Sequence, residues 1–249
     1  MSSGWRLVSA ATPQLLAERA ADEFANAASD AIRDRGRFAV ALSGGKTPRA
    51  MLEALSARAL DWNSIHFFWS DERCVGPEDP NSNYRMANEA LLSRIAVPAG
   101  NIHRMRGELE PSAGATAYDA ELRAFFGERA PVFDLLFLGL GPDGHTASLF
   151  PGTDALNITD VWCAANQVSG PVASPWRLTL TYPAINSARR VIFLVEGAEK
   201  ADILATVLGP KKDVRRYPAQ GIAPTEGELV WLVDVAAAAK LQPSLLTNE

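Results

Sequence analysis

The chain has 249 residues, of which 47% are apolar, and its formal net charge at pH 7 is −5. This length and apolar content are enough for a substantial hydrophobic core. No run of Lys and Arg is longer than two residues, as at Lys211-Lys212. We therefore expect no nucleic acid partner, because binding to a phosphate backbone requires a concentrated basic surface.

The N-terminal residues and the cysteines bear on the cellular compartment. Residues 1–6 have neither the basic start nor the apolar core of a signal peptide. No apolar run approaches the roughly 18 residues that span a bilayer, so we expect no membrane contact. Cys74 and Cys163 lie far apart in the sequence and form no metal-type pair, which fits a reducing compartment. The expected location is the cytoplasm.

Helix and strand patterns alternate along nearly the whole chain. Thr12 and Pro13 are typical of a helix start, and apolar residues follow at helical spacing to about residue 35. Further helices are predicted at 48–58, 84–95, 112–129, 199–208 and 235–241. Strands are predicted at 38–42, 65–69, 133–138, 161–166, 177–181, 191–195 and 229–234.

The predicted strands are apolar on both faces, which is typical of a parallel sheet buried between helices. We therefore expect an α/β fold: a doubly wound, mostly parallel sheet with helices on both faces. The sequence shows no internal repeat and no linker-like change in composition. A single domain spanning residues 1–249 is the simplest prediction.

The first cluster that suggests chemistry is a glycine-rich turn, residues 43–48, between a predicted strand and a predicted helix. We expect Thr47 to cap the helix and Pro48 to lie in its first turn. Glycines and free backbone amides at a helix start favour a bound anion, although a purely structural turn fits the pattern equally well. The spacing is not that of a Walker A loop, and Ala41 stands where a nucleophile elbow needs glycine.

The second cluster is Asp71-Glu72-Arg73, which directly follows a buried strand and precedes the polar segment 81–84. Three charged residues in this position are unusual unless they face a cleft. The planar guanidinium of Arg73 suits phosphate or carboxylate oxygens, and Asp71 could orient it or accept hydrogen bonds from sugar hydroxyls. A solvated loop with a local ion pair is the alternative interpretation.

The third cluster is the glycine-rich turn that follows the strand at 133–138 and carries Asp143 and His145. Ligands of open α/β sheets bind beyond the carboxyl ends of the strands. The unperturbed pKa of histidine lies nearest neutral pH among side chains, which suits proton transfer there. Arg177 and Lys200 also lie near predicted strand ends, although each alone is more typical of a surface charge.

The histidines do not indicate a metal site. His66, His103 and His145 are scattered, and none belongs to a recognised metal-binding spacing. His66 lies within a predicted strand and is expected either to be a core residue or to support a functional side chain from behind. We expect neither a metal nor another cofactor.

Together the three clusters resemble the glucosamine-6-phosphate isomerase/6-phosphogluconolactonase family, and within it the lactonases. The motifs that carry the resemblance are residues 43–48, 70–73 with 82–84, and 139–152, continued by 177–181 and 231–234. Arg73 stands where the deaminase pattern has an aromatic residue. Residues 146–151 replace the deaminase segment that contains the ring-opening glutamate.

The resemblance implies a deaminase-like, modified Rossmann architecture and hydrolysis of 6-phospho-D-glucono-1,5-lactone, the second step of the oxidative pentose phosphate pathway. It implies that His145 acts as general base toward water, with Asp143 or Asp71 holding the ring. The residues implied in binding the substrate and its phosphate are Ser43, Gly44, Gly45, Thr47, Arg73, Arg177 and Lys200. The glycine turn could serve either the phosphate or the carbonyl oxygen. The expected partner is the phosphosugar lactone alone, bound by a monomer or a small homo-oligomer.

Three other functions compete with this prediction. A sugar-phosphate isomerase or deaminase of the same fold is disfavoured by Arg73 and by the absent glutamate. A non-catalytic sugar-phosphate regulator is disfavoured by the Asp143 and His145 pair. A serine esterase with Ser43 as nucleophile would instead react with a serine-directed phosphonate.

Overall fold

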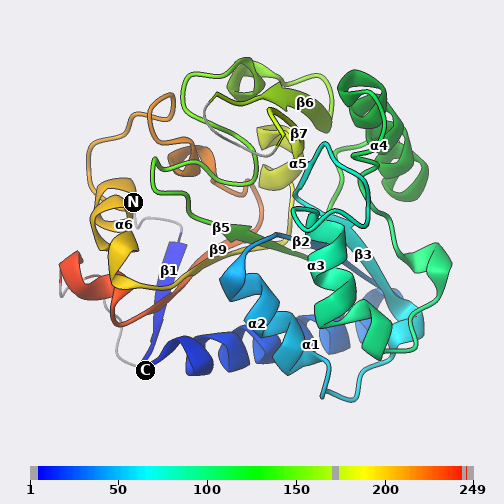
Figure 1. The fold of residues 1–249 in the computed structure, drawn as a ribbon. Helices are drawn as coiled ribbons and strands as arrows, with labels where there is room; N and C mark the ends of the chain where they lie inside the picture. Colours follow the sequence, from blue (N-terminus) through cyan, green and yellow to red (C-terminus); the bar gives the residue numbers. More distant parts are fainter. Residues whose placement is uncertain (1–4, 170–173, 243–244, 246–249) are drawn as a thin grey trace.

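The computed structural model describes residues 5–169, 174–242 and 245. Residues 1–4, part of the segment in which we found no signal peptide, lie outside the described residues. A six-stranded parallel sheet forms the centre of the molecule, in the order β1-β9-β8-β5-β2-β3 (Figure 1). Its strands are β1 (Trp5–Ala10), β2 (Phe38–Leu42), β3 (Ile65–Trp69), β5 (Leu135–Gly139), β8 (Arg190–Val195) and β9 (Glu228–Asp234). The predicted α/β fold with a mostly parallel sheet is confirmed.

A second, smaller sheet corrects part of the prediction. It is antiparallel and consists of β4 (Asp71–Arg73), β7 (Trp176–Leu180) and β6 (Cys163–Gln167), in that order. The segment between β6 and β7, residues 168–175, is shorter than the dozen or so residues of a parallel crossover. The strands predicted at 161–166 and 177–181 therefore belong to this sheet and not to the parallel one.

The helices pack on both sides of the main sheet. The α-helices are α1 (Pro13–Arg35), α2 (Lys46–Leu55), α3 (Asn83–Ala90), α4 (Pro111–Phe126), α5 (Tyr182–Asn186) and α6 (Ala201–Val207). In Figure 1, α1 and α2 pack together below the main sheet, and α4 packs against the small sheet above it. Among the described residues, no helix combines the length and apolar character needed to cross a membrane.

Helix α1 shows how the local sequence builds the core. Thr12 caps it by accepting a hydrogen bond from the Leu15 amide at 3.2 Å, and Gly36 ends it in the left-handed region at φ 74°. The buried Phe24 ring packs edge-on against Phe38 of β2, with 5.2 Å between ring centroids. The predicted first helix is confirmed at both ends.

Helix α2 differs from the prediction at its start. It begins at Lys46, and its N-cap is Gly45, which has φ 114° and contributes no side-chain cap. Because glycine tolerates this φ, the chain turns into the helix two residues before Thr47. Our prediction of Thr47 as the cap is wrong: its side chain is buried in the first helical turn.

Smaller differences concern short elements and helix ends. Strand β1 at the sheet edge was not predicted, because Arg6 and Ser9 interrupt its apolar pattern. The short helix α5 was also missed. The helices expected at 84–95, 199–208 and 235–241 are shorter and are accompanied or replaced by 3₁₀ turns at Leu92–Arg94, Ala198–Lys200 and Ala237–Lys240.

Candidate active site

A cavity of about 410 Å³ opens where the carboxyl ends of β2 and β5 approach the small sheet. Seven of the predicted site residues line it: Ser43, Gly44, Asp71, Arg73, His145, Arg177 and Lys200. Three others do not line it: Gly45, Thr47 and Asp143. The structure therefore brings all three sequence clusters into one cavity.

The loop that follows β5 presents His145 to this cavity. The Gly141 amide donates to the His145 carbonyl at 2.8 Å, and the Gly144 amide donates to the Gly141 carbonyl at 3.0 Å. Gly144 has φ 82°, which favours glycine. A Cβ atom on Gly141 would overlap the His145 ring, so the ring occupies space that only glycine leaves free.

Two neighbours hold the His145 imidazole. Its Nδ1 lies 2.6 Å from Oδ1 of Asp143, and its ring stacks on Phe150 with 4.1 Å between centroids. Burial acts to raise the pKa of Asp143, but the hydrogen bond and charge of His145 lower it below its usual value. With Nδ1 bound to this carboxylate, Nε2 is the nitrogen left to accept a proton.

Asp71 makes different contacts. It is buried, and its Oδ1 accepts from Asn83 Nδ2 at 3.2 Å while its Oδ2 accepts from Ser148 Oγ at 2.7 Å. Among the described residues, no hydrogen bond joins Asp71 to His145. Each carboxylate oxygen has a second lone pair, so Asp71 can still accept from a ligand in the cavity.

Glu72 does not face the cavity, which contradicts our expectation for all three charged residues of its cluster. Its Oε1 accepts from the amides of Arg73 and Asn83, each at 2.7 Å. Its Oε2 accepts from the Tyr84 amide at 2.8 Å and from Ser82 Oγ at 3.0 Å. Burial raises the pKa of Glu72, while these donors act in the opposite direction. Glu72 thus ties the start of α3 to β4.

Asn83 is a site residue that sequence reasoning passed over. Its Nδ2 donates to the Asp71 carbonyl at 2.9 Å as well as to the Asp71 carboxylate, and the residue lines the cavity. A Cβ atom on Gly44 would overlap the Asn83 side chain, so Gly44 permits their close approach. The sequence feature that could have identified Asn83 is its position at the polar start of a helix, directly after Ser82.

Three cationic side chains reach the cavity from three elements. Arg73 comes from β4, Arg177 from β7, and Lys200 from the 3₁₀ turn that follows β8. Within the described part of the chain, no carboxylate forms an ion pair with any of them. Burial and the neighbouring charge of Arg73 lower the pKa of Arg177. This concentration of positive charge favours a bound anion.

The arginines are held by backbone oxygens. Arg73 Nη1 donates to the Asn81 carbonyl at 2.6 Å, and Arg177 Nη1 donates to the carbonyls of Ser174 and, at 3.0 Å, Trp176. Neutral carbonyl partners position a guanidinium without cancelling its charge. Both groups keep further N–H donors for a ligand.

Ser43 is placed for structure and not for nucleophilic attack. Its buried hydroxyl donates to the Phe137 carbonyl at 3.0 Å and lies 2.8 Å from the Ser70 hydroxyl. No histidine among the described residues contacts it. This geometry lacks the adjacent base that activates a serine, and it disfavours the serine esterase.

Comparisons with known proteins agree with this geometry. Residues 11–231 match the family model described as glucosamine-6-phosphate isomerases/6-phosphogluconolactonase. The chain is 45% identical over 234 residues to the 6-phosphogluconolactonase of Synechocystis sp., covering 92% of this chain and 95% of that protein. It is 46% identical over 215 residues to that of Nostoc sp., covering 85% of this chain and 88% of that protein.

Solved structures show the same relationship. The 6-phosphogluconolactonase from Trypanosoma brucei superposes with a TM-score of 0.86 at 30% identity, covering 96% of this chain and 99% of that chain. A monomeric glucosamine-6-phosphate deaminase superposes with a TM-score of 0.80, covering 94% and 99%, but at 20% identity it shows the shared fold alone. The chain belongs to the glucosamine-6-phosphate isomerase/6-phosphogluconolactonase family.

Proposed function

We propose that this chain hydrolyses 6-phospho-D-glucono-1,5-lactone to 6-phospho-D-gluconate in the oxidative pentose phosphate pathway. One observation supports the proposal most strongly. His145, whose ring is held by Asp143, lines the same cavity as Arg73, Arg177 and Lys200. A general base beside a cationic anchor suits a neutral, reactive ester that carries a phosphate. The lactonase relatives at 45% and 46% identity support the same substrate.

In the proposed mechanism, His145 Nε2 takes a proton from water while the water oxygen attacks the lactone carbonyl. Such a base contributes about 10²–10⁴-fold to a rate. The tetrahedral oxyanion then collapses, the ring C–O bond breaks, and the imidazolium returns its proton to the departing ring oxygen. Asp143 accepts from Nδ1–H throughout, and so keeps the ring in the tautomer that leaves Nε2 free.

The remaining residues divide between the two ends of the substrate. We assign the phosphate to Arg73, Arg177 and Lys200, whose charges lack carboxylate partners in the described chain. The Gly44 amide lines the cavity and is our candidate donor to the oxyanion, a contact of about 3 kcal/mol when well aimed. Asp71 serves sugar hydroxyls in this assignment.

The other residues of the glycine turn have a supporting role in this proposal. Gly45 and Thr47 do not line the cavity and act by starting α2, and Ser43 fixes the turn through its bond to the Phe137 carbonyl. We therefore assign the glycine turn to the oxyanion and not to the phosphate.

The setting of the enzyme is also proposed. The free thiols Cys74 and Cys163 support a reducing location such as the cytoplasm. We also propose that the protein acts as a monomer or a small homo-oligomer. One hydrophobic core and a family match over residues 11–231 support a single domain.

A coupled or pH-stat assay tests the activity. Freshly generated phosphogluconolactone is mixed with the protein, and the rate is corrected for spontaneous hydrolysis. We expect a large acceleration, with no ammonia released from glucosamine 6-phosphate in parallel. A folded protein that leaves the lactone rate at its spontaneous value would refute the proposed function.

A further inference from the structure

A second cavity lies at the opposite edge of the main sheet, where β2 and β5 begin. Its volume is about 250 Å³, and it is lined by the four arginines Arg35, Arg37, Arg129 and Arg189, by Asp134, and by an apolar wall that includes Phe126. Arg37 directly precedes β2 and Asp134 directly precedes β5. The candidate active site lies beyond the other ends of the same two strands, so the two cavities are separate.

One carboxylate is shared between two of the four arginines. Asp134 Oδ1 lies 3.0 Å from Arg35 Nη2 and 3.4 Å from Arg189 Nε. Its Oδ2 accepts from the Ala39 amide at 2.9 Å, which anchors the group to the start of β2. Asp134 therefore fixes the rim of the cavity but neutralises only one positive charge.

The other two arginines have no acidic partner in the part of the chain that the structure describes. Within the described residues, neither Arg37 nor Arg129 forms an ion pair with a carboxylate. The Arg37 guanidinium lies 4.2 Å from the centre of the Phe125 ring, a cation–π contact that does not neutralise its charge. Four guanidinium groups against one carboxylate give the lining a formal charge of +3.

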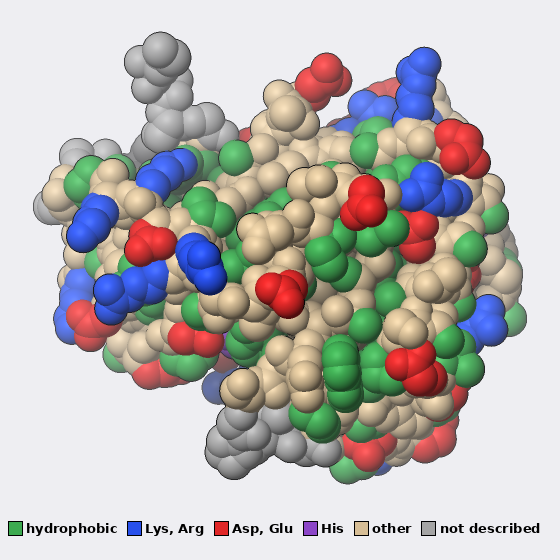
Figure 2. Space-filling model, turned by 90° about the horizontal axis from the view of Figure 1, so that it is seen from above, with side chains coloured by type: hydrophobic (Ala, Val, Ile, Leu, Met, Phe, Trp, Pro, Cys, Tyr) green, Lys and Arg blue, Asp and Glu red, His purple; other side chains and the backbone are tan. Residues whose placement is uncertain are grey.

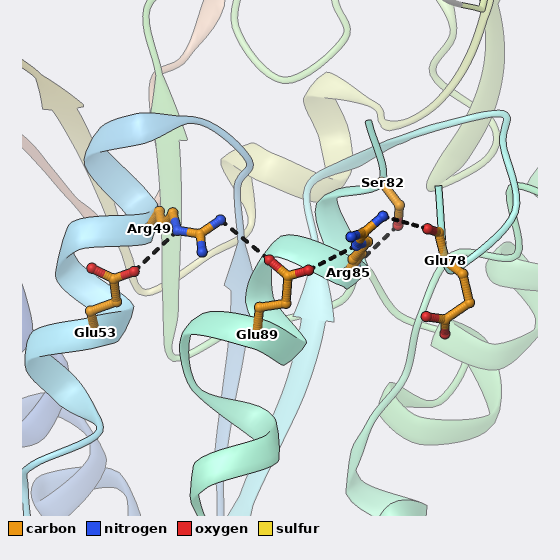
Figure 3. A network of polar contacts seen from close by, with 6 residues as sticks. All are labelled: Arg49, Glu53, Glu78, Ser82, Arg85 and Glu89. Carbon is orange, nitrogen blue, oxygen red and sulfur yellow. Dashed lines mark hydrogen bonds and ion pairs between the residues drawn. The ribbon is translucent and has the colours of Figure 1, made fainter. Parts of the chain in front are cut away.

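This excess is not a general property of the surface. Figure 3 shows Arg49 and Arg85 on either side of Glu89, at 3.4 Å and 2.8 Å, with Glu53 a further 3.1 Å partner of Arg49. Basic and acidic side chains are likewise interspersed over the face shown in Figure 2. The formal net charge of the whole chain is −5, so the charge of this cavity has the opposite sign to that of the protein.

A neighbouring residue is influenced by the same charge. Burial, then the charges of His103 and Arg37, lower the pKa of His66 to about 4. His66 lies on β3, the strand next to β2. Of the four cavity arginines, Arg37 is the one whose charge contributes to this shift.

We propose that this cavity binds a small phosphate-bearing dianion or trianion. A guanidinium group can form two parallel hydrogen bonds to phosphate oxygens. A multiply charged anion would also balance the formal charge of +3 that the lining keeps once Asp134 is counted. The volume of about 250 Å³ lies below the range of roughly 300–1,000 Å³ for drug-sized ligands, which restricts the ligand to about the size of pyrophosphate. This inference is independent of the proposed lactonase activity.

Isothermal titration calorimetry with inorganic pyrophosphate, at constant ionic strength, tests the proposal. The cavity variant is Arg37→Gln with Arg129→Gln, because neither side chain holds an ion pair that the fold depends on. The matched control is Arg49→Gln with Arg85→Gln, which removes the same charge elsewhere on the surface. Arg73→Gln reports any binding in the candidate active site.

We expect a binding event that survives in Arg73→Gln and in the matched control, and that weakens at least tenfold in the cavity variant. The single charge reversal Arg129→Glu should abolish it, and the thermal midpoints of this variant and of the cavity variant should match that of the wild type. Equal weakening in the cavity variant and the matched control, loss in Arg73→Gln alone, or no binding at millimolar pyrophosphate would each overturn the proposal. Tighter binding of citrate than of pyrophosphate would overturn the choice of a phosphate ligand.

Discussion

The Nδ1 atom of His145 lies 2.6 Å from Oδ1 of Asp143, two residues earlier in the same turn. The same carboxylate oxygen also accepts from the His145 backbone amide at 3.1 Å. Both contacts are local, so the turn itself sets the geometry of the pair. A base oriented in this way before substrate arrives needs little reorganisation during proton transfer.

Asp143→Asn should therefore damage catalysis more than binding. The amide can present its NH₂ group to Nδ1 and favour the tautomer that protonates Nε2, which cannot act as a base. We expect kcat to fall at least about tenfold with KM nearly unchanged. A wild-type kcat would show that Asp143 does not orient the base.

Gly141→Ala should displace the His145 ring without removing any polar group. The new Cβ would overlap the imidazole, which is confined on its other side by Phe150. We expect kcat to fall by about 10²-fold, as a misplacement of about 1 Å can cause. Gly100→Ala is the matched control, because a Cβ there meets nothing within 4 Å and Gly100 does not line the cavity. Equal activity of the two variants would mean that the ring position is not critical.

Arg73→Ala should act mainly on substrate binding. Its guanidinium lines the cavity, is held by the Asn81 carbonyl and has no carboxylate partner in the described chain. We expect KM for the phosphorylated lactone to rise about 10–100-fold, the effect of losing roughly 1.5–3 kcal/mol from a charged hydrogen bond. Turnover of dephosphorylated gluconolactone should change little. Arg104→Ala is the control, since Arg104 pairs with Glu108 at 2.7 Å and does not line the cavity. An unchanged KM for the phosphorylated lactone would show that Arg73 does not bind the phosphate.

His66 should make the protein less stable in acid. Burial, with the charges of His103 and Arg37, lowers its pKa in the folded state to about 4, whereas the unfolded value is near 6.5. Between these values the unfolded chain binds more protons, so the free energy of unfolding falls as pH decreases from about 6.5 to about 4. His66→Leu should flatten that slope in urea unfolding measured at pH 7 and pH 4.5. His103 and Glu121, which form a 2.9 Å pair beside it, remain in the variant. An unchanged slope would show that His66 is not the source of the acid sensitivity.

Much of the site could be predicted because parallel strands end at one edge. The turns that follow β2 and β5 were expected to meet there, and Gly44 and His145 do line one cavity. Arg73 reaches the cavity from a different sheet. It lies on β4 of the small antiparallel sheet, opposite Arg177. The sequence suggests Arg73 as an anion ligand and the resemblance implies Arg177, but neither indicates the sheet that brings the two together.

The direction in which each side chain points was the main feature of the site that the sequence could not predict. In the strand β4, neighbouring residues point to opposite faces, which sends Asp71 to the cavity and Glu72 to the amides of α3. No strand is predicted at residues 71–73, so this alternation could not be applied to them. The sequence could not decide between Asp71 and Asp143 as the partner of His145 for the same reason. That decision depends on which carboxylate points toward the imidazole ring.

The kcat of His145→Ala on freshly generated phosphogluconolactone, corrected for spontaneous hydrolysis, tests the proposed mechanism most directly. We predict that kcat falls by about 10²–10⁴-fold. KM should stay within a few-fold of the wild-type value, and the circular dichroism spectrum and thermal midpoint should match those of the wild type. A variant that is folded and retains wild-type kcat would show that His145 is not the base.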